Sequence, residues 1–138
     1  MLRTMLLSVV VLVSTGSVRA DPVADCNQQE DPDRRIKGCT QFIEQRASEK
    51  RSLPAAYVNR GNAYHSRGEY DQAIADYGKA IEINPKYAEA YNNRGATHEK
   101  KLDRGKAIAD YRMALSIDPS SRGGALARDN LKRLGVGP

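Results

Sequence analysis

The sequence predicts an all-α protein whose central part consists of two copies of a helix pair. The first observation is an internal repeat: segment 88–121 directly follows segment 54–87, has the same length, and carries the same residue at thirteen aligned positions. The second is that apolar residues within each segment recur at three- and four-residue spacing, as on one face of a helix. A repeat of this length is typical of solenoids, in which each unit buries its apolar face against the next. We therefore expect a short α-α superhelix.

The first helix of segment 54–87 has Tyr57, Gly61 and Tyr64 on one face. Gly68 interrupts this pattern, and we expect a turn there. Asp71 follows as the expected N-cap of the second helix, because its carboxylate can accept hydrogen bonds from free first-turn N–H groups.

The second helix carries an apolar stripe that ends at Asn84-Pro85, because proline disfavours helical backbone in the residue before it. The stripe consists of Ala73, Ile74, Tyr77, Ala80 and Ile81. Segment 88–121 repeats these positions and ends at Asp118-Pro119. Small residues alternate with tyrosines in both segments, so we expect the two helices of each pair to pack closely.

This spacing resembles the tetratricopeptide repeat: an aromatic residue, glycine and tyrosine in the first helix, then alanine, an aromatic residue, alanine and proline. Both segments match it at Tyr57/Tyr91, Gly61/Gly95, Ala73/Ala107, Tyr77/Tyr111, Ala80/Ala114 and Pro85/Pro119. Arg60 and Arg94 depart from it, since leucine is usual there, and His98 replaces the tyrosine kept at Tyr64. The resemblance implies that the first helices line a concave groove that holds a partner peptide or helix.

The resemblance also implies which residues face that groove. They are Val58, Asn59, Asn62 and His65 in the first segment and Asn92, Asn93, Ala96 and Glu99 in the second. Asparagine suits this role because its amide can both donate to and accept from a peptide backbone. We therefore expect a non-enzymatic protein–protein interaction module, a scaffold or adaptor whose partner is a protein or peptide and which needs no cofactor.

Some tetratricopeptide proteins hold a C-terminal carboxylate with two asparagines and several basic residues. Asn62 and Asn93 match the two asparagine positions. Val58, Gly123 and Ala127 stand where lysine or arginine would be expected. The resemblance therefore argues against a carboxylate clamp of that kind.

The flanking segments are expected to protect the two ends of the array. Segment 21–53 predicts a half repeat and a loop: Asp31-Pro32 indicates an N-cap followed by proline at the first helical position. Segment 122–138 predicts a capping helix and a tail. An alternative is that Leu126, Leu131 and Leu134 form an interface between copies, which would make the protein a self-associating structural component of an envelope assembly.

Residues 1–20 have the pattern of a secretory signal peptide. Arg3 precedes an apolar stretch, and Val18-Arg19-Ala20 resembles a cleavage site. We expect cleavage after Ala20 and a periplasmic or secreted protein. The apolar stretch is too short to span a bilayer, and no other segment could do so, so we do not expect an integral membrane protein.

Export bears on the two cysteines, Cys26 and Cys39. An even number in an oxidising compartment favours a disulfide, which would hold the tail that contains Cys26 against the half-repeat helix. A buried free thiol and a metal pair are the alternatives, although the spacing is unlike a zinc motif and no histidine is near. The chain is also similar to small exported alphaproteobacterial tetratricopeptide proteins, which have an upstream cysteine and a Gly-Cys-Thr run, here Gly38-Cys39-Thr40.

Composition and motifs indicate no catalytic, metal or nucleic-acid function. The formal net charge of +5 becomes +3 once Arg3 and Arg19 leave with the signal peptide. Basic and acidic residues alternate along the chain, which favours a solvated surface over a nucleic-acid site. Asp76 and Asp110 recur beside the packing tyrosines, and we interpret them as exposed polar surface. We expect no catalytic site.

Overall fold

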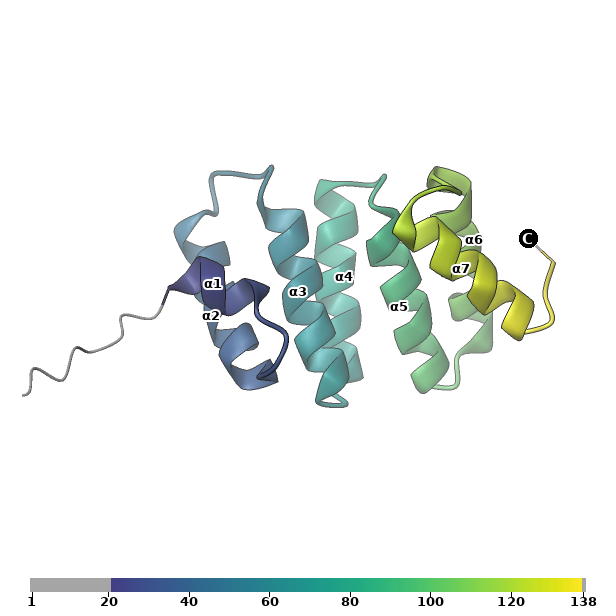
Figure 1. Cartoon of the computed structure of the whole chain (residues 1–138), viewed down its shortest axis with the longest axis horizontal. Helices are drawn as coiled ribbons and strands as arrows, with labels where there is room; N and C mark the ends of the chain where they lie inside the picture. The colour runs from purple at the N-terminus through teal and green to yellow at the C-terminus, as the bar shows by residue number, and fades with distance from the viewer. Residues whose placement is uncertain (1–20, 138) are drawn as a thin grey trace, which may run out of the picture.

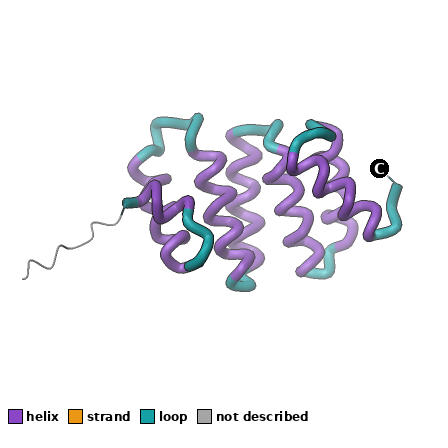
Figure 2. The backbone as a smooth tube through the Cα atoms, in the orientation of Figure 1, coloured by secondary structure: helices purple, strands orange, loops and turns teal. Residues whose placement is uncertain are grey.

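The computed structural model describes residues 21–137, and every regular element in that stretch is a helix (Figure 2). The helices are α1 (Pro22–Asn27), α2 (Pro32–Gln45), α3 (Leu53–Ser66), α4 (Tyr70–Ile83), α5 (Ala88–Lys100), α6 (Arg104–Ile117) and α7 (Arg122–Arg133). They lie side by side along one axis, from α1 at one end to α7 at the other (Figure 1). The predicted all-α superhelix is confirmed. The predicted signal peptide, 1–20, lies outside the described residues.

The helices form two rows. Figure 1 shows α1, α3, α5 and α7 in front and α2, α4 and α6 behind them. Contacts are most extensive between α3 and α4 and between α5 and α6, the two helices of each predicted repeat. The front row therefore contains the first helix of each repeat, together with α1 and α7.

Each repeat is held together by a glycine of its first helix that meets a tyrosine of its second. A Cβ atom on Gly61 would lie 2.7 Å from Cε1 of Tyr77, and one on Gly95 would lie 2.9 Å from Cε1 of Tyr111. Both tyrosines are at most 1% exposed. The predicted close packing of small residues against tyrosines is therefore confirmed.

The turn inside each repeat differs from the prediction at the start of its second helix. Gly68 has φ +76°, in the left-handed region that glycine adopts freely, and α4 begins two residues later. The prediction that Asp71 is the N-cap is wrong, because Glu69 occupies that position and Asp71 lies in the first turn of α4, paired with Lys101. Asp103, the equivalent of Glu69, does cap α6 by accepting from the backbone N–H of Lys106 at 3.1 Å.

Each repeat also contains an ion pair that the sequence interpretation missed. Arg60 donates from Nε and Nη2 to the two carboxylate oxygens of Asp76 at 2.7 and 2.8 Å. Arg94 and Asp110 form the same pair, with both distances 2.8 Å. The interpretation of these aspartates as exposed is wrong, because they are only 5% and 7% exposed. A buried carboxylate needs a partner of opposite charge, and the arginine that replaces leucine supplies it.

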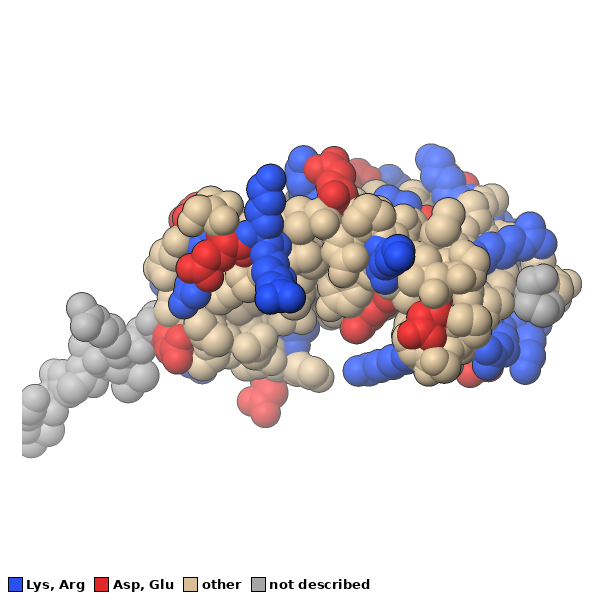
Figure 3. Space-filling view, turned by 90° about the horizontal axis from the view of Figure 1, so that it is seen from above, with Lys and Arg blue, Asp and Glu red and all other residues tan. Residues whose placement is uncertain are grey.

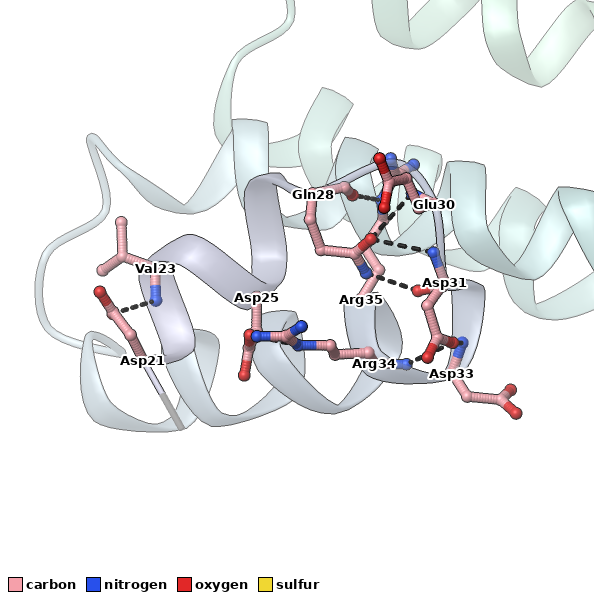
Figure 4. Close-up of polar contacts among 9 residues, drawn as sticks. All are labelled: Asp21, Val23, Asp25, Gln28, Glu30, Asp31, Asp33, Arg34 and Arg35. Atoms are coloured by element: carbon pink, nitrogen blue, oxygen red, sulfur yellow. Dashed lines mark hydrogen bonds and ion pairs between the residues drawn. The ribbon is translucent and has the colours of Figure 1, made fainter. Parts of the chain in front are cut away.

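The N-terminal segment forms a shortened helix pair instead of a half repeat with a tail. Asp21 caps the six-residue α1 and Asp31 caps α2, both by accepting from backbone N–H groups (Figure 4). Arg34 donates to Asp25 at 2.6 Å, which joins the two helices. Gly38 allows close approach, because its Cβ would lie 2.5 Å from Cβ of Asp25.

The structure joins Cys26 to Cys39, with an S–S distance of 2.00 Å. Both cysteines are buried, at 3% and 0% exposed, and pack with Ala56 of α3. The predicted disulfide is therefore present, and it fixes α1 to α2.

The C-terminal end of the array is covered by α7. Ser121 caps α7 by accepting from the backbone N–H of Gly124 at 3.1 Å. Ala127 and Leu131 pack into the core cluster around Tyr111. Of the leucines considered as an interface between copies, Leu131 is 1% exposed and belongs to the core, whereas Leu126 is 42% exposed.

Candidate functional site

Asparagine side chains connect the helices of the front row. Oδ1 of Asn62 accepts from Nδ2 of Asn93 at 3.0 Å, which links α3 to α5. Oδ1 of Asn92 accepts from Nδ2 of Asn130 at 3.1 Å, which links α5 to α7. Within α5, Nδ2 of Asn92 donates to Oδ1 of Asn93 at 3.1 Å. A continuous chain of amides therefore crosses α3, α5 and α7.

Two further contacts anchor this asparagine chain. The hydroxyl of Tyr77 donates to Oδ1 of Asn62 at 2.7 Å. Burial raises the pKa of Tyr77, which keeps its hydroxyl protonated as a donor. At the other end of the row, Nδ2 of Asn59 donates to Oδ1 of Asn27 at 3.1 Å and so links α1 to α3.

Two hollows open beside the asparagine chain, and they are lined by equivalent positions of successive repeats. The first, of about 240 Å³, is lined by Asn62, His65, Ser66, Tyr77, Asn93 and Ala96. The second, of about 310 Å³, is lined by Ala96, Glu99, Lys100, Tyr111, Asn130 and Arg133. A shift by one repeat length maps five of the six positions in the first hollow onto positions in the second. Ala96 borders both, so the hollows are adjacent.

The first hollow is electrically neutral. His65 Nδ1 lies 2.9 Å from the hydroxyl oxygen of Thr97. Burial, and to a smaller extent the charge of Lys100, lower the pKa of His65 below its ordinary value of 6.5. His65 is therefore uncharged at neutral pH, and this hollow presents hydrogen-bonding groups without a net charge.

The second hollow carries charges. Arg133 donates to Glu99 at 2.6 Å, and the Tyr111 hydroxyl donates to the same carboxylate oxygen at 2.7 Å. The hydrogen bond from Arg133 is the largest influence that lowers the pKa of Glu99, which keeps it ionised. Lys100 has no ion-pair partner within residues 21–137. The second hollow therefore carries a net positive charge.

The eight predicted groove residues divide into three groups. Asn62, His65, Asn93, Ala96 and Glu99 line the two hollows. Asn59 lies outside them, beside α1.

Two predicted groove residues do not fit that role. The prediction for Val58 is wrong, because its side chain is 2% exposed and packs in the core cluster with Tyr77 and Ala90. Asn92 is 5% exposed and uses its amide to bond Asn93 and Asn130. Both side chains therefore stabilise the scaffold.

Three polar side chains of the second hollow were missed by the sequence interpretation: Lys100, Asn130 and Arg133. A signal for two of them was present. Asn130 and Arg133 stand one repeat length after Ala96 and Glu99. Extending the repeat frame into the C-terminal helix would have found both.

Two tetratricopeptide family models match the chain, one described as TPR repeat over residues 51–101 and one as Tetratricopeptide repeat over residues 88–121. Together with the helix pairs described above, these matches show that the chain belongs to the tetratricopeptide repeat family. The comparison with curated proteins gave no match.

Several solved structures are similar to this one. The Arabidopsis OM64 TPR domain has a TM-score of 0.63 at 26% identity over 74% of this chain and 81% of its own. The first TPR of Spaghetti (RPAP3), bound to the HSP90 peptide SRMEEVD, has a TM-score of 0.65 at 25% identity. The match covers 75% of this chain and 77% of that one. The TPR2B domain of yeast Sti1, in complex with pHsp70, has a TM-score of 0.62 at 25% identity. The match covers 75% of this chain and 78% of that one.

Within residues 21–137, no helix is both long and apolar enough to cross a membrane. The same residues contain no group of three or more histidine, cysteine, aspartate or glutamate side chains placed to hold a metal ion.

Proposed function

We propose that this protein is a non-enzymatic interaction module that binds an extended peptide across the two adjacent hollows. The observation that carries the proposal is the repetition of one hollow on neighbouring front-row helices, with amides between them. Neighbouring helix axes lie about 8–10 Å apart, and an extended peptide advances about 3.3 Å per residue. Side chains on one face of an extended peptide recur every second residue, about 6.6 Å apart. Side chains two residues apart in one peptide would therefore enter the two hollows together.

The electrostatics of the hollows indicate what each would accept. The neutral first hollow suits an uncharged side chain that hydrogen-bonds to Asn62, Asn93 or His65. The second, with Lys100 unpaired among the described residues, suits a carboxylate. The partner that fits best is thus an extended peptide with an acidic residue toward α7.

The structural neighbours support this proposal, because two of them are complexes: RPAP3 is bound to an HSP90 peptide, and the TPR2B domain of yeast Sti1 is in complex with pHsp70. The clamp with basic residues at positions 123 and 127 remains disfavoured here. A Cβ on Gly123 would lie 2.4 Å from the backbone N of Glu89, and Ala127 is fully buried. Neither position faces the hollows.

The proposal is tested by filling the hollows without breaking the asparagine chain. Asn62→Ala is a poor test, because it would leave the buried Tyr77 hydroxyl without its acceptor. Ala96→Gln places a larger neutral side chain at the border of both hollows. Met113→Gln, at an exposed site of α6 that lines neither hollow, is the matched control.

Peptides selected from a display library against the wild-type protein would be measured by fluorescence anisotropy with each variant. We expect Ala96→Gln to weaken binding at least about tenfold, or about 1.4 kcal/mol, and Met113→Gln to leave it unchanged. Equal affinity in the wild type and Ala96→Gln would remove the hollows from the binding site. A library that yields no binder would count against the whole proposal.

We further propose that the protein is exported, through cleavage of residues 1–20 after Ala20, and works in the periplasm or outside the cell. The buried disulfide Cys26–Cys39 supports an oxidising compartment. In this setting the partner is another envelope or secreted protein. Mass spectrometry of the protein from its native cells should show a chain that begins at Asp21, and a full-length cytoplasmic chain with reduced cysteines would refute export.

A further inference from the structure

The turn between α5 and α6 contains a leucine where the repeat requires a left-handed residue. Leu102 has φ +63° and is the one non-glycine residue with positive φ within residues 21–137. The equivalent position in the first repeat is Gly68, with φ +76°. The same turn is therefore built once with glycine and once with leucine.

The fold gives no reason for this leucine. Left-handed backbone costs a residue with a Cβ atom about 1–2 kcal/mol, whereas glycine adopts it freely. The side chain recovers none of this by burial, because Leu102 is 92% exposed. Local strain that packing does not require is characteristic of functional positions.

Leu102 and Leu134 lie at an apolar part of the surface in a segment that is rich in lysine and arginine. Leu102 borders a shallow hollow of about 200 Å³ together with Glu99, Arg104 and Leu134. Residues 101–137 contain eight lysines and arginines against four acidic residues, and Figure 3 shows basic side chains at this end of the molecule. Residues 21–33, at the opposite end, contain five acidic residues and no basic one. Asp25 and Asp33 are paired with Arg34 and Arg67, which leaves Asp21, Glu30 and Asp31 without an ion-pair partner within residues 21–137.

A hollow that can hold one aliphatic side chain lies near the N-terminal end of the molecule. It has a volume of about 100 Å³ and is lined by Val23, Cys26, Asn27, Phe42, Ser52, Ala55, Ala56 and Asn59. It exists because α1 has six residues whereas α3 has fourteen, so that α1 leaves part of α3 uncovered. The volume is below the roughly 150 Å³ of a cavity that admits benzene, which suits a single aliphatic side chain.

We propose that the protein associates head to tail with a second copy of itself, with Leu102 of one copy inserted into the α1–α3 hollow of the next. Burial of an apolar side chain supplies the attraction. Attraction between the basic side chains of residues 101–137 and the carboxylates of Asp21, Glu30 and Asp31 orients the copies. Because the two surfaces differ, the contact is heterologous, and copies can add at both ends. The contact uses neither of the peptide hollows.

The test is sedimentation velocity of the oxidised protein, expressed from the full sequence, over a wide concentration range. We expect the wild type to form oligomers that grow with concentration. Leu102→Gly removes the side chain that inserts and restores the residue type of the first repeat. It should weaken association at least about tenfold without lowering the melting temperature. Met113→Gln, which removes another exposed apolar side chain, should associate like the wild type.

A mixture of two variants tests the pairing itself. Ala55→Arg, at an exposed site on the hollow, should block the acceptor surface and leave Leu102 intact. At concentrations where each variant alone is monomeric, the mixture of Leu102→Gly with Ala55→Arg should form dimers, because each supplies the surface that the other lacks.

Three results would overturn the proposal: a wild type that stays monomeric at every concentration, a Leu102→Gly protein that associates as strongly as the wild type, and a mixture that stays monomeric. None of them bears on the peptide hollows, because the selected peptides should bind Leu102→Gly with unchanged affinity.

Discussion

Removing the charge of Asp76 tests whether the repeated ion pair stabilises the fold. Asp76→Asn keeps the shape of the side chain but leaves Arg60 without a counter-charge between α3 and α4. The side chains are 18% and 7% exposed, so water replaces little of the lost interaction. Breaking a buried pair costs about 3–5 kcal/mol, and the partly exposed arginine places this pair near the lower end, at about 3 kcal/mol.

The second pair provides an internal comparison. Arg94 and Asp110 have side chains that are 25% and 10% exposed, slightly more than in the first pair. Arg60 also donates to the Thr40 hydroxyl of α2 at 3.0 Å, whereas the structure gives Arg94 no such third contact within the described residues. Arg60→Met should therefore destabilise the protein more than Arg94→Met.

Urea denaturation followed by circular dichroism measures these differences, and about 3 kcal/mol corresponds to a fall of roughly 10–15 °C in melting temperature for a domain of this size. Glu82→Gln, in the exposed pair with Lys79, is the control and should change nothing measurable. The double variant Arg60→Met/Asp76→Asn should lose less than the sum of its single changes. A loss below about 1 kcal/mol for Asp76→Asn, as for a surface pair, would refute the reasoning.

Three other changes have definite expected outcomes. Replacing Cys26 and Cys39 together by serine should lower the free energy of unfolding by about 3 kcal/mol, measured by urea titration, and reductant should have no further effect on that variant. Gly95→Ala should destabilise by about 1–3 kcal/mol through contact with the core, whereas Gly78→Ala, with open space around its Cβ, should not destabilise. Burial lowers the pKa of His65, so the unfolded chain binds more protons and stability should fall as pH drops below about 6.5; a urea midpoint that is constant from neutral to mildly acidic pH would contradict this.

The superhelix was predictable because it depends on residues that the repeat duplicates. Gly61 and Tyr77 recur at the same spacing as Gly95 and Tyr111. Because the same two residue types meet in both repeats, both helix pairs pack in the same way. The end of α4 before Pro85 and the cap of α2 by Asp31 follow from the chemistry of single residues, and both occur in the structure.

The errors arose where the side of a helix that a residue faces depends on a neighbour elsewhere in the chain. Val58 and Asn92 have the same position in their helices, and both are buried, at 2% and 5% exposed. Val58 is buried because it packs in the core cluster that includes Ala90 of α5. Asp76 is polar and lies beside tyrosines, and only the arginine sixteen residues earlier reveals that it is buried. The helix α1 was missed because its six residues are too short for an apolar period, and α2 holds it through the disulfide and Arg34.

The two repeats are alike at the positions that pack the helices and differ at most of the positions that line the hollows. Positions that pack the helix pairs carry identical residues in both copies, as in Gly61/Gly95 and in the arginine–aspartate pairs. Most positions that line the two hollows differ, since histidine at 65 becomes glutamate at 99 and serine at 66 becomes lysine at 100. Because both hollows keep the same shape-determining tyrosine, this difference alters their charge while leaving the backbone alike. A partner that bound only through features common to both repeats would fit either hollow and slide between them. The divergent residues make the pair of hollows asymmetric, with the neutral hollow toward α3 and the basic one toward α7. In the binding mode proposed above, this asymmetry favours one orientation of the peptide.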